Sequence, residues 1–525
     1  MKSIGAVVLI VFLAVSIADG ANILYIAGVA SRSHFIWNRS LIYGLADKGH
    51  NVTALSLDVE KNAPENVHFI HMEGVYDSIL NDSSSAQSDF FGMGKISPFG
   101  MLFEFDEFCI SCCRYSLKSN GFKTLMDYPS DFKFDLIIND YLGGPCISAA
   151  ALHKFNRPPL VAVTAYNGMT TTTPLAGSFA YSGVIPNHVF DATEDMCLIE
   201  RVKNFFYDYY EIVLKEHYTY PTMDQLVRKI IPDIDYVAEF NKLARIVMLN
   251  ANAAIQFSEP SMPNVIGIGG LQIREPKPLP KDLQTILDNA KNGVVLFSLG
   301  SNVRSDTLGS ERILAILEAM RAFPDICFLW KFESDTFPTE VPKNVFIRPW
   351  MPQNDLLAHP NLKLFITHSG LLSTQEAIWY GVPLIGFPVF ADQYRNINYC
   401  TKVGIAKRLS IDKVNSEELK QAIQEMISDP KYIQNMKKLS KVFRDQPEKP
   451  LERAIWWVEW VLRNPDVNYH QSSAIDKSWA TKYAFDVLLA IFITIAISIH
   501  VIIYSVNYFV FKKQSTSTKQ KSKGE

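Results

Sequence analysis

Cysteine and excess charge are both scarce in this chain. It has 525 residues but only 7 cysteines, too few for a scaffold built on disulfides. Because 7 is an odd number, at least one thiol is free or pairs outside the chain. The 51 Lys and Arg residues nearly balance the 54 Asp and Glu residues. With a formal charge of -3, the chain as a whole lacks the excess of positive charge that is typical of nucleic-acid-binding proteins. Two motifs are also missing: neither G-x-G-x-x-G nor G-x-x-x-x-G-K-[ST] occurs, which disfavours a standard dinucleotide fold or a P-loop.

Length and composition favour a folded protein of several domains. Hydrophobic residues make up 48% of the chain and charged residues 20%, which excludes a disordered, collagen-like or coiled-coil protein. At about 100–200 residues a domain, the chain is long enough for about two to four units with large cores.

The first 20 residues have the pattern of a secretory signal peptide. Lys2 precedes an apolar run over residues 4–17, and small residues stand at Ala18 and Gly20, where we expect cleavage. The alternatives are an uncleaved anchor or a buried strand. A cleaved signal peptide would direct the rest of the chain into the secretory pathway.

The other end carries a long apolar run. Residues 487–511 contain no Asp, Glu, Lys or Arg, and about 20 apolar residues suffice for a helix that crosses a bilayer. Lysines crowd the tail at residues 512–525, and the positive-inside rule places such a tail in the cytosol. We therefore predict a single-pass type I membrane protein whose bulk is lumenal. Lys521 and Lys523 resemble a dilysine retrieval signal, which predicts the endoplasmic reticulum membrane; the alternative is a plain basic flank.

Three Asn-x-Ser/Thr sequons are consistent with a lumenal chain, at Asn38, Asn51 and Asn81. Asn81 stands in a polar stretch and is the strongest candidate to carry a glycan. Asn38 falls in a predicted helix next to a candidate catalytic residue, which argues against a glycan there.

Between the two ends, short apolar runs alternate with helical patterns. In the first half we expect strands at 22–29, 52–57, 67–71, 135–139 and 160–164, with helices at 33–48 and 145–155. In the second half we expect strands at 294–298, 326–332, 345–348, 364–367 and 383–386, with helices at 311–322, 373–380, 392–403, 416–428 and 431–444. This alternation predicts an α/β fold with a doubly wound parallel sheet in each half.

A stretch rich in Pro and Gly separates the halves. The expected domain limits are 21–263 for the first domain, 264–282 for the linker, 283–463 for the second domain and 464–486 for a juxtamembrane linker. Two α/β domains joined in this way make a cleft between them, which is a common place for a ligand.

Polar residues follow the strand that ends at Thr367. The carboxyl end of a parallel strand faces the ligand crevice, and the N-terminus of the next helix offers free N–H groups that suit phosphate. His368 can add a donor, Ser373 and Thr374 can add hydroxyls, and Glu376 can accept from sugar hydroxyls. The alternative is that Ser373 or Thr374 merely caps the helix, with Glu376 as its partner in a capping box.

Two further groups flank this motif. Trp350 stands between two prolines after a strand, where a rigid indole can stack on a flat base, and Gln353 can bond the edge of that base. The alternative for Trp350 is an ordinary core position. Asp392 and Gln393 lie at a strand-to-helix turn, where they can bind sugar hydroxyls or where Asp392 can simply cap its helix.

The stretch from Trp350 to Gln393 resembles the nucleotide-sugar signature of the UDP-glycosyltransferases, the membrane-bound UDP-glucuronosyltransferase family. The motifs W-x-P-Q-x-x-L-L, H-x-G-x-x-S-x-x-E-A, G-V-P-x-I-x-x-P and D-Q stand here in order, and the two chain ends are similar too. The resemblance implies the GT-B fold, with two facing Rossmann-like domains and a C-terminal transmembrane helix. It also implies these roles: Trp350 stacks on uracil, Gln353 contacts the nucleoside, His368, Gly370, Ser373 and Thr374 hold the diphosphate, Glu376 binds ribose, Asp392 and Gln393 bind the sugar, and Ser298, Gly300 and Ser301 complete the wall.

The chain departs from the family pattern at two positions. Leu372 stands where many relatives carry Asn, which removes one possible phosphate donor, and Ser369 stands where many carry Gly or Cys. The sequence of residues 371–375 resembles that of the invertebrate branch of the family, which tends to prefer UDP-glucose to UDP-glucuronate.

The first half supplies the candidate catalytic pair. His34 follows the first strand, and histidine is suited to general-base work near neutral pH. Asp140 ends another strand and can orient the imidazole; Asn139 is the substitute if Asp140 is misplaced. The alternative for either residue is a helix cap or a satisfied polar group. By the resemblance, the counterpart of His34 deprotonates the acceptor hydroxyl, which attacks the anomeric carbon opposite UDP and inverts it.

Metal is not expected in this mechanism. The resemblance implies that the departing UDP is stabilised by the helix N-terminus and His368. Asp233-Ile234-Asp235 spells D-x-D but lies outside the signature, in an expected helical stretch after Pro232, where it indicates a solvated face. The run from Cys109 to Cys113 resembles half a zinc site, yet no second half follows at metal spacing.

Two aromatic clusters in the first domain are candidates for an acceptor pocket. They are Phe90, Phe91, Phe99, Phe103, Phe105 and Phe108, and then Phe205, Phe206, Tyr207, Tyr209, Tyr210 and Tyr218. Such density suits apolar, phenol-like or steroid-like acceptors, but the same residues can form core or lie on a membrane surface.

Two classes of function follow from these patterns. The favoured one is a membrane-anchored transferase that moves glucose or glucuronate from a UDP-sugar to a hydroxyl of a small lipophilic molecule. The alternative is a non-catalytic nucleotide-sugar or lipophile binder of the same fold, which would not need His34 and Asp140. A transferase with one fixed lipid or cell-surface acceptor, and a homo-oligomer, are both left open.

Overall fold

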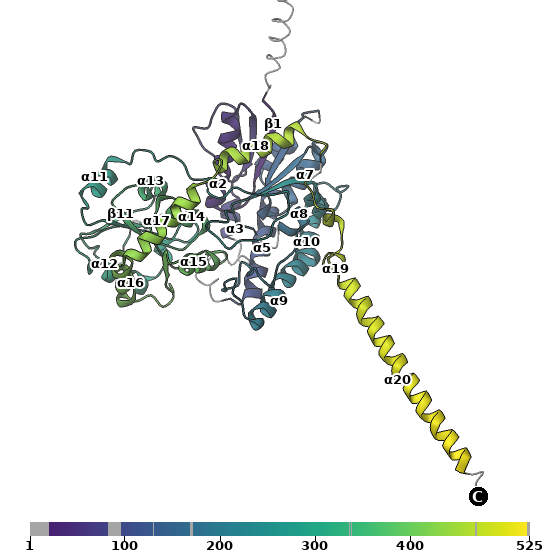
Figure 1. Ribbon diagram of the computed structural model, residues 1–525. Coiled ribbons are helices and arrows are strands. Elements are labelled where there is room, and N and C mark those ends of the chain that lie inside the picture. The colour runs from purple at the N-terminus through teal and green to yellow at the C-terminus, as the bar shows by residue number, and fades with distance from the viewer. Residues whose placement is uncertain are drawn as a thin grey trace, which may run out of the picture. The chain divides into compact units, whose positions relative to one another are not determined.

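The computed structural model describes residues 20–81, 96–129, 131–168, 172–334, 336–337, 339–467 and 470–521 (Figure 1). The chain divides into two compact units, Met1–Ser472 and Ser473–Glu525. The expected signal peptide, except Gly20, and Phe90, Phe91 and Lys523 lie outside the described residues.

The first sheet has seven parallel strands in the order β3-β2-β1-β4-β5-β6-β7. Its strands are β1 Asn22–Ala27, β2 Asn51–Ser56, β3 Val67–His71, β4 Leu136–Asp140, β5 Leu160–Thr164, β6 Ala244–Leu249 and β7 Val265–Gly267. The order reverses between β1 and β4, where Ile26 lies opposite Asn139. In open α/β sheets, ligands bind at such a reversal, outside the carboxyl ends of the strands.

The second sheet has six parallel strands in the order β10-β9-β8-β11-β12-β13. Its strands are β8 Val294–Ser298, β9 Cys327–Lys331, β10 Val345–Arg348, β11 Leu362–Thr367, β12 Leu384–Gly386 and β13 Ala406–Arg408. Here the order reverses between β8 and β11, where Ser298 lies opposite Thr367. Two Rossmann-like sheets confirm the predicted fold class.

Helices cover both sheets, as expected for runs of residues with one buried face. In the first half these are α2 Arg32–Asp47, α3 Val75–Leu80, α5 Pro98–Ser116, α6 Asn120–Met126, α7 Cys146–Lys154, α8 Thr173–Ala176, α9 Leu198–Leu214 and α10 Tyr220–Arg228. In the second half they are α11 Lys281–Asn289, α12 Ser310–Arg321, α13 Gln353–Leu357, α14 Leu371–Tyr380, α15 Gln393–Lys402, α16 Ser416–Ser428, α17 Pro430–Arg444 and α18 Pro450–Arg463. Each sheet with the helices packed on it is called a lobe below.

Two segments pack with the first lobe although the sequence patterns placed them elsewhere. Strand β7, inside the expected linker, pairs with β6. Helix α18, expected in the second domain, packs on α2 and β6, as its green ribbon among the purple and blue elements shows (Figure 1). A Cβ on Gly44 of α2 would lie 2.7 Å from a methyl carbon of Leu451, so glycine allows this close crossing.

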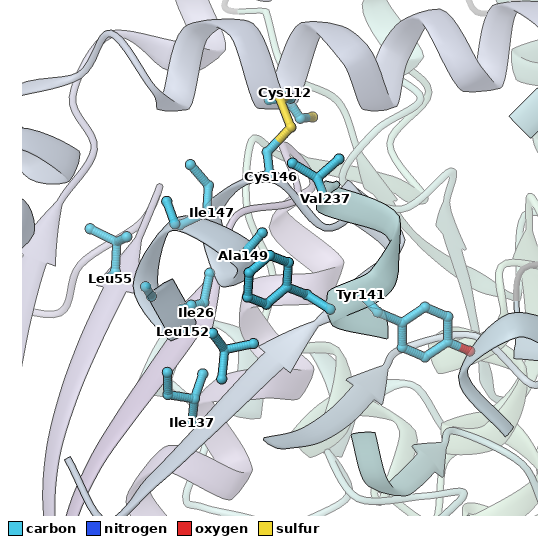
Figure 2. Packing of buried hydrophobic residues seen from close by; sticks show 14 of the residues in the cluster. Ile26, Leu55, Cys112, Ile137, Tyr141, Cys146, Ile147, Ala149, Leu152 and Val237 are labelled. Carbon is cyan, nitrogen blue, oxygen red and sulfur yellow. A yellow bond between two sulfur atoms is a disulfide. The ribbon is translucent and has the colours of Figure 1, made fainter. Parts of the chain in front are cut away.

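The core under α7 shows how small residues let a helix lie close to a sheet. Ala149, Ala150 and Ala151 are fully buried in the largest hydrophobic cluster of the first lobe. Figure 2 shows Ile147, Ala149 and Leu152 of this helix over Ile26 and Ile137 of neighbouring strands. This packing holds β1 and β4 firmly, and both strands end at the crevice.

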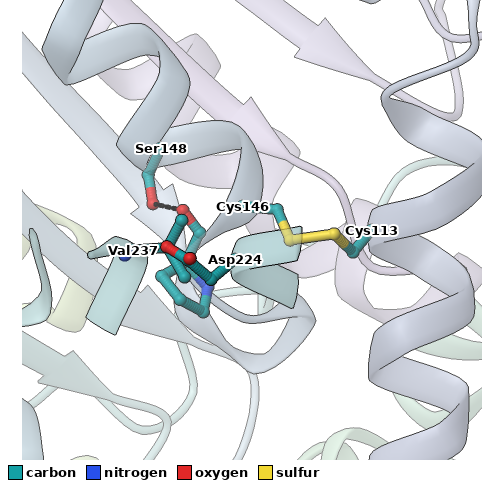
Figure 3. The surroundings of a disulfide bond; sticks show 6 residues. Cys113, Cys146, Ser148, Asp224 and Val237 are labelled. Carbon is teal, nitrogen blue, oxygen red and sulfur yellow. Dashed lines mark hydrogen bonds between the residues drawn. A yellow bond between two sulfur atoms is a disulfide. The ribbon is translucent and has the colours of Figure 1, made fainter. Parts of the chain in front are cut away.

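A disulfide joins Cys113 of α5 to Cys146, the first residue of α7 (Figure 3). Cys109 and Cys112, on the same helix as Cys113, are buried free thiols. The bridge ties α5 to the helix that follows β4. Disulfides persist in oxidising compartments and are rare in the cytosol.

The second unit contains one long helix, α20 Phe485–Lys521, after the short α19 Trp479–Lys482. Within its residues Phe485–Lys512, an 18-residue window has a mean hydropathy of 2.7, and by length and composition this stretch can cross a membrane. The expected span at 487–511 lies inside it. The apolar helix is thus confirmed, while its place in a bilayer stays a prediction.

Removing the disulfide should destabilise the first lobe. The two cysteines are 33 residues apart, and closing a loop of that length stabilises a fold by about 3–4 kcal/mol in the chain-entropy account. We therefore expect the double variant C113S/C146S to melt several degrees below the wild type in differential scanning calorimetry. Reductant should lower the wild-type Tm and leave that of the double variant unchanged. Equal melting temperatures for the two proteins would show that the bridge is absent.

Candidate functional site

A cleft of about 740 Å³ lies between the two lobes, at the carboxyl ends of both sheets. It is lined by these predicted residues: His34, Ser298, Gly300, Ser301, Trp350, Gln353, His368, Gly370, Ser373, Glu376, Asp392 and Gln393. Asp140 lies directly behind His34, and only Thr374 of the predicted set is directed elsewhere. The two lobes also bond to each other at the cleft, where Asn302 Nδ2 donates to Ser31 Oγ at 3.1 Å.

His34 is held by a buried chain of hydrogen bonds. Its Nδ1 lies 2.6 Å from Asp140 Oδ2, and the same oxygen accepts a bond of 2.8 Å from Asn38 Nδ2. Asn38 Oδ1 in turn accepts from the hydroxyl of Tyr25 at 2.9 Å. Burial, together with the charge of Asp140, raises the pKa of Tyr25 well above its usual value, so this hydroxyl stays a donor.

This chain of bonds selects one tautomer of His34. An ionised carboxylate only accepts, so Nδ1 carries the proton and Nε2 keeps a lone pair. The capping alternative for His34 does not hold, because Ser31 occupies the N-cap position of α2. It is Asp140, rather than Asn139, that contacts the imidazole.

The structure removes Asn38 from the glycosylation candidates. Its side chain is 1% exposed, and its amide nitrogen is committed to Asp140. A glycan on that nitrogen would break the bond and has no room in the core. Asn51 is exposed at the start of β2 and Asn81 is exposed after α3, so both stay predictions.

Helix α14 begins at the crevice without a side-chain cap. Its N-cap is Gly370, and the first backbone bond of the helix runs from Thr374 N to Gly370 O. The capping-box alternative for Ser373, Thr374 and Glu376 is therefore wrong. The N–H groups of the first turn are left without helical partners, and such groups favour an anion.

The ring of His368 fits between two glycines. A Cβ on Gly300 would lie 2.4 Å from His368 Cε1, and one on Gly370 would lie 2.4 Å from His368 Nε2. Burial, with a smaller effect from the charge of Lys331, lowers the pKa of His368 to about 4. The imidazole is therefore neutral near pH 7 and has one N–H to donate.

Gln353 bridges two residues of the next helix. Its Nε2 donates to Glu376 Oε2 at 2.7 Å and to Ser373 Oγ at 3.1 Å. Burial raises the pKa of Glu376 to about 7, although the bond from Gln353 opposes this. Trp350 is 58% exposed at the rim of the cleft, so the alternative of a core position is wrong.

Asp392 and Gln393 stand where α15 begins. Asp392 is at the N-cap but makes no capping bond; its Oδ2 accepts from Asn396 Nδ2 at 2.8 Å. Burial raises the pKa of Asp392 to about 6, against the effects of the bond from Asn396 and the charge of Arg395. Gln393 Oε1 accepts from the backbone N–H of Val389 at 2.7 Å, which leaves its amide nitrogen for a ligand.

Thr374 does not meet the expectation placed on it. Its hydroxyl is buried without a hydrogen-bond partner among the described residues, and the side chain lines a different small cavity, with Asn167 and Tyr399. One residue along a helix turns the side chain by about 100°, so Ser373 faces the cleft and Thr374 does not.

Sequence reasoning missed three residues of the site. Lys331 ends β9, lines the cleft and has its ammonium 5.8 Å from the centre of the Trp350 ring. The rule that marks the carboxyl ends of parallel strands could have found it. Asn38 stands four residues after His34, on the same face of α2, so helical spacing could have found it too. Tyr25 carried no signal beyond its place in a buried strand.

A second cavity of about 240 Å³ shares His34 with the cleft. Its apolar lining includes Met101, Phe105, Phe108 and Leu142. The aromatic clusters therefore divide: Phe105 and Phe108 line this cavity, whereas other members are exposed, namely Phe99, Phe103, Phe205, Phe206 and Tyr218. Exposed Phe205 and Phe206 lie on α9 together with Leu198 and Ile199, so this helix presents an apolar face to its surroundings.

The D-x-D sequence lies in a turn rather than a helix. Ile234 is buried, and Asp235 pairs with Arg157. Among the described residues, no group of three His, Cys, Asp or Glu side chains is placed to hold a metal ion.

Comparison with known proteins agrees with this architecture. The family model described as "UDP-glucoronosyl and UDP-glucosyl transferase" matches residues 22–521. UDP-glucosyltransferase 2 of Dactylopius coccus is 28% identical over 522 residues, covering 97% of each chain. UDP-glucuronosyltransferase 2B15 of Homo sapiens is 30% identical over 504 residues, covering 94% of each chain.

Solved glycosyltransferases share the fold. Phytolacca americana UGT2, complexed with UDP-2fluoro-glucose and pterostilbene, has a TM-score of 0.57 at 16% identity, covering 85% of this chain and 100% of that one. The glycotransferase of kitacinnamycin has a TM-score of 0.54 at 18% identity, covering 84% of this chain and 98% of that one. These likenesses confirm the predicted GT-B fold.

The two glycines around His368 provide a steric test of the cradle. Gly300 and Gly309 both have a positive φ, of +85° and +82°, but a Cβ on Gly309 meets nothing within 4 Å. Both G300A and G309A thus carry the same backbone strain, and only G300A also displaces the imidazole. We expect G300A to weaken UDP binding at least about tenfold in isothermal titration calorimetry, while G309A binds as the wild type does. Equal affinity of the two variants would show that His368 takes no part in binding.

Proposed function

Because this chain belongs to the family of UDP-glucuronosyl and UDP-glucosyl transferases, we propose that it moves glucose or glucuronate from a UDP-sugar to a hydroxyl of a small lipophilic acceptor, with inversion at the anomeric carbon. The observation that carries the proposal is the His34–Asp140 pair at 2.6 Å, on the opposite side of one cleft from the first turn of α14. A protein that only binds nucleotide sugars has no use for an oriented imidazole at that place.

The donor is held by the second lobe. Trp350 offers an exposed indole face on which uracil can stack. Gln353 and Glu376, which are bonded to each other, then contact the nucleoside and its ribose. The diphosphate takes the free N–H groups of the first turn of α14 and the one N–H of His368. Asp392 and the amide nitrogen of Gln393 then face the sugar.

The acceptor enters from the first lobe. Its apolar body fits the 240 Å³ cavity lined by Phe105 and Phe108, and its hydroxyl reaches His34, which the cavity shares with the cleft. That volume is just below the range for drug-sized ligands, which favours compact acceptors such as phenols.

His34 then acts as the general base. Its Nε2 takes the hydroxyl proton as the acceptor oxygen bonds to the anomeric carbon, and the bond from that carbon to the UDP oxygen breaks with its electron pair leaving on UDP. Asp140 stabilises the imidazolium that forms, and Asn38 keeps Asp140 in place. One displacement turns an α-linked donor into a β-glycoside.

The same proposal includes the compartment. The Cys113–Cys146 disulfide is expected to persist in an oxidising compartment. Helix α20 is apolar and long enough to span a membrane. Both features support a type I protein of the endoplasmic reticulum membrane with lumenal lobes, held by the lysine-containing tail.

Replacing His34 should separate chemistry from donor binding. With UDP-glucose or UDP-glucuronate and a phenol, we expect H34A to lose a factor of about 10²–10⁴ in kcat while its affinity for UDP is unchanged, because general-base catalysis contributes that much. H217A, which alters an exposed histidine of the same lobe, is the matched control and should keep full activity. Turnover of H34A at the wild-type rate would remove His34 as the base, and no transfer by the wild type from either donor would overturn the proposed function.

The raised pKa of Glu376 makes a prediction for the pH dependence of nucleoside binding. A ribose hydroxyl donates best to an ionised carboxylate, so binding favours the charged form of a group whose pKa is about 7 in the free protein. Uridine affinity should therefore fall as the pH drops below 7 and level off above it. Uridine has neither phosphate nor hexose, which removes the titration of the diphosphate from the measurement. In calorimetry, E376Q should bind more weakly and show no such dependence; a flat profile for the wild type would mean that Glu376 does not contact ribose.

A further inference from the structure

The segment of residues 187–195, here called the acceptor wall, forms one side of the acceptor cavity. It has no helix or strand and precedes α9. Its first residue is fixed within the first lobe: Asn187 N donates to Asn204 Oδ1 at 2.7 Å, and Asn187 Nδ2 donates to Asp208 Oδ1 at 2.8 Å. Both partners lie on α9.

The far end of the acceptor wall is fixed to the second lobe instead. Arg408, at the end of β13, donates two parallel bonds of 2.7 Å to the carboxylate of Asp191. Asn398 Nδ2 of α15 donates to Asp191 Oδ1 at 2.9 Å. Lys402, one turn later on α15, pairs with both Glu194 and Asp195. Although burial opposes it, bonding to Arg408 and Asn398 lowers the pKa of Asp191, so the carboxylate is charged at neutral pH.

Between these two anchors the wall faces the acceptor. His188 and Val189 line the 240 Å³ cavity together with Phe390 of the second lobe. Phe190 packs with the ring of Tyr207 on α9, their centroids 5.3 Å apart. The cavity is thus closed by residues whose position depends on contacts between the lobes.

Helix α15 contacts both the sugar position in the cleft and the acceptor wall. Asp392, which faces the sugar, precedes its first residue, and Asn398 and Lys402 hold the wall about two and three turns further along. A single rigid helix therefore connects the sugar position with the wall of the acceptor cavity.

We propose that Asp191, Asn398 and Arg408 are positioning residues that set the affinity for the acceptor by tying the acceptor wall to α15 and β13. This inference rests on the proposed function, since it concerns the acceptor site of the same transferase. None of the three residues lines the cleft or the acceptor cavity, so they act through the wall and not on the substrates.

The size of the effect follows from the exposure of the pair. The side chains of Arg408 and Asp191 are 33% and 46% exposed, and ion pairs that water reaches contribute little unless their geometry is good. A planar two-bond pair is the favourable case. Its loss should raise the acceptor KM by roughly threefold to tenfold.

The test compares two neighbouring cations of β13 in the full-length protein in detergent micelles. R408Q removes the bonds to the wall. K407Q is the matched control, because Lys407 pairs with Glu425 of α16 and stays within the second lobe. With naphthol as acceptor and UDP-glucose or UDP-glucuronate as donor, we expect R408Q and D191N to raise the naphthol KM by this factor, and to leave the donor KM and the UDP affinity unchanged. K407Q should leave all of them unchanged.

Two further readouts exclude a merely structural effect. The charge-swapped double variant D191R/R408D should recover part of the naphthol affinity lost in D191R alone. Salt should raise the naphthol KM of the wild type by a larger factor than that of R408Q, since exposed ion pairs are screened and R408Q keeps only the pairs of Lys402 with Glu194 and Asp195. An unchanged naphthol KM in R408Q and D191N would overturn this inference alone, whereas a wild type that transfers sugar from neither donor would overturn the proposed function.

Discussion

The hydrogen bond between His34 and Asp140 is the contact on which the proposed chemistry depends. It exists because β1 and β4 are neighbours at the point where the first sheet reverses its order, so Asp140 at the end of β4 meets His34, which follows β1. Asn38 and Tyr25 complete the chain behind it, and every member is buried. The buried carboxylate of Asp140 accepts from His34, Asn38 and the backbone N–H of Leu142, and it is stable only as long as its donors are present, which makes the imidazole a fixed and not a mobile group.

Burial sets the charges on the other side of the cleft. Glu376 and Asp392 have pKa values raised to about 7 and about 6, so part of their negative charge is withdrawn before a donor with a charged diphosphate arrives. His368 is neutral for the same reason and acts as a hydrogen-bond donor without competing for protons near pH 7. The cleft therefore offers an anion backbone N–H groups and a neutral imidazole donor, beside the ammonium of Lys331 in its lining.

How far the sequence predicts this structure depends on which physical signal each residue carries. The strand that ends at Thr367 and the polar turn after it could be predicted, because a short apolar run and a Gly-containing turn are local patterns. The family motif marks the same residues. Thr374 was misjudged since composition does not show which face of α14 is turned to the cleft. The partner of α18 was equally hidden: the expected domain limits placed residues 450–463 in the second domain, and no local pattern shows that the first sheet buries them. The contacts of Asp191 with Arg408, 217 positions apart, and the Cys113–Cys146 pairing arise only from the tertiary fold.

The most direct measurement is a crystal structure of the protein with a non-transferable fluorinated UDP-sugar and a phenol bound together. We expect the phenol oxygen within about 2.6–3.2 Å of His34 Nε2, in line with the anomeric carbon and on the face opposite the departing UDP oxygen. A phenol bound with its oxygen away from His34, with the lobes closed on the donor, would contradict this expectation.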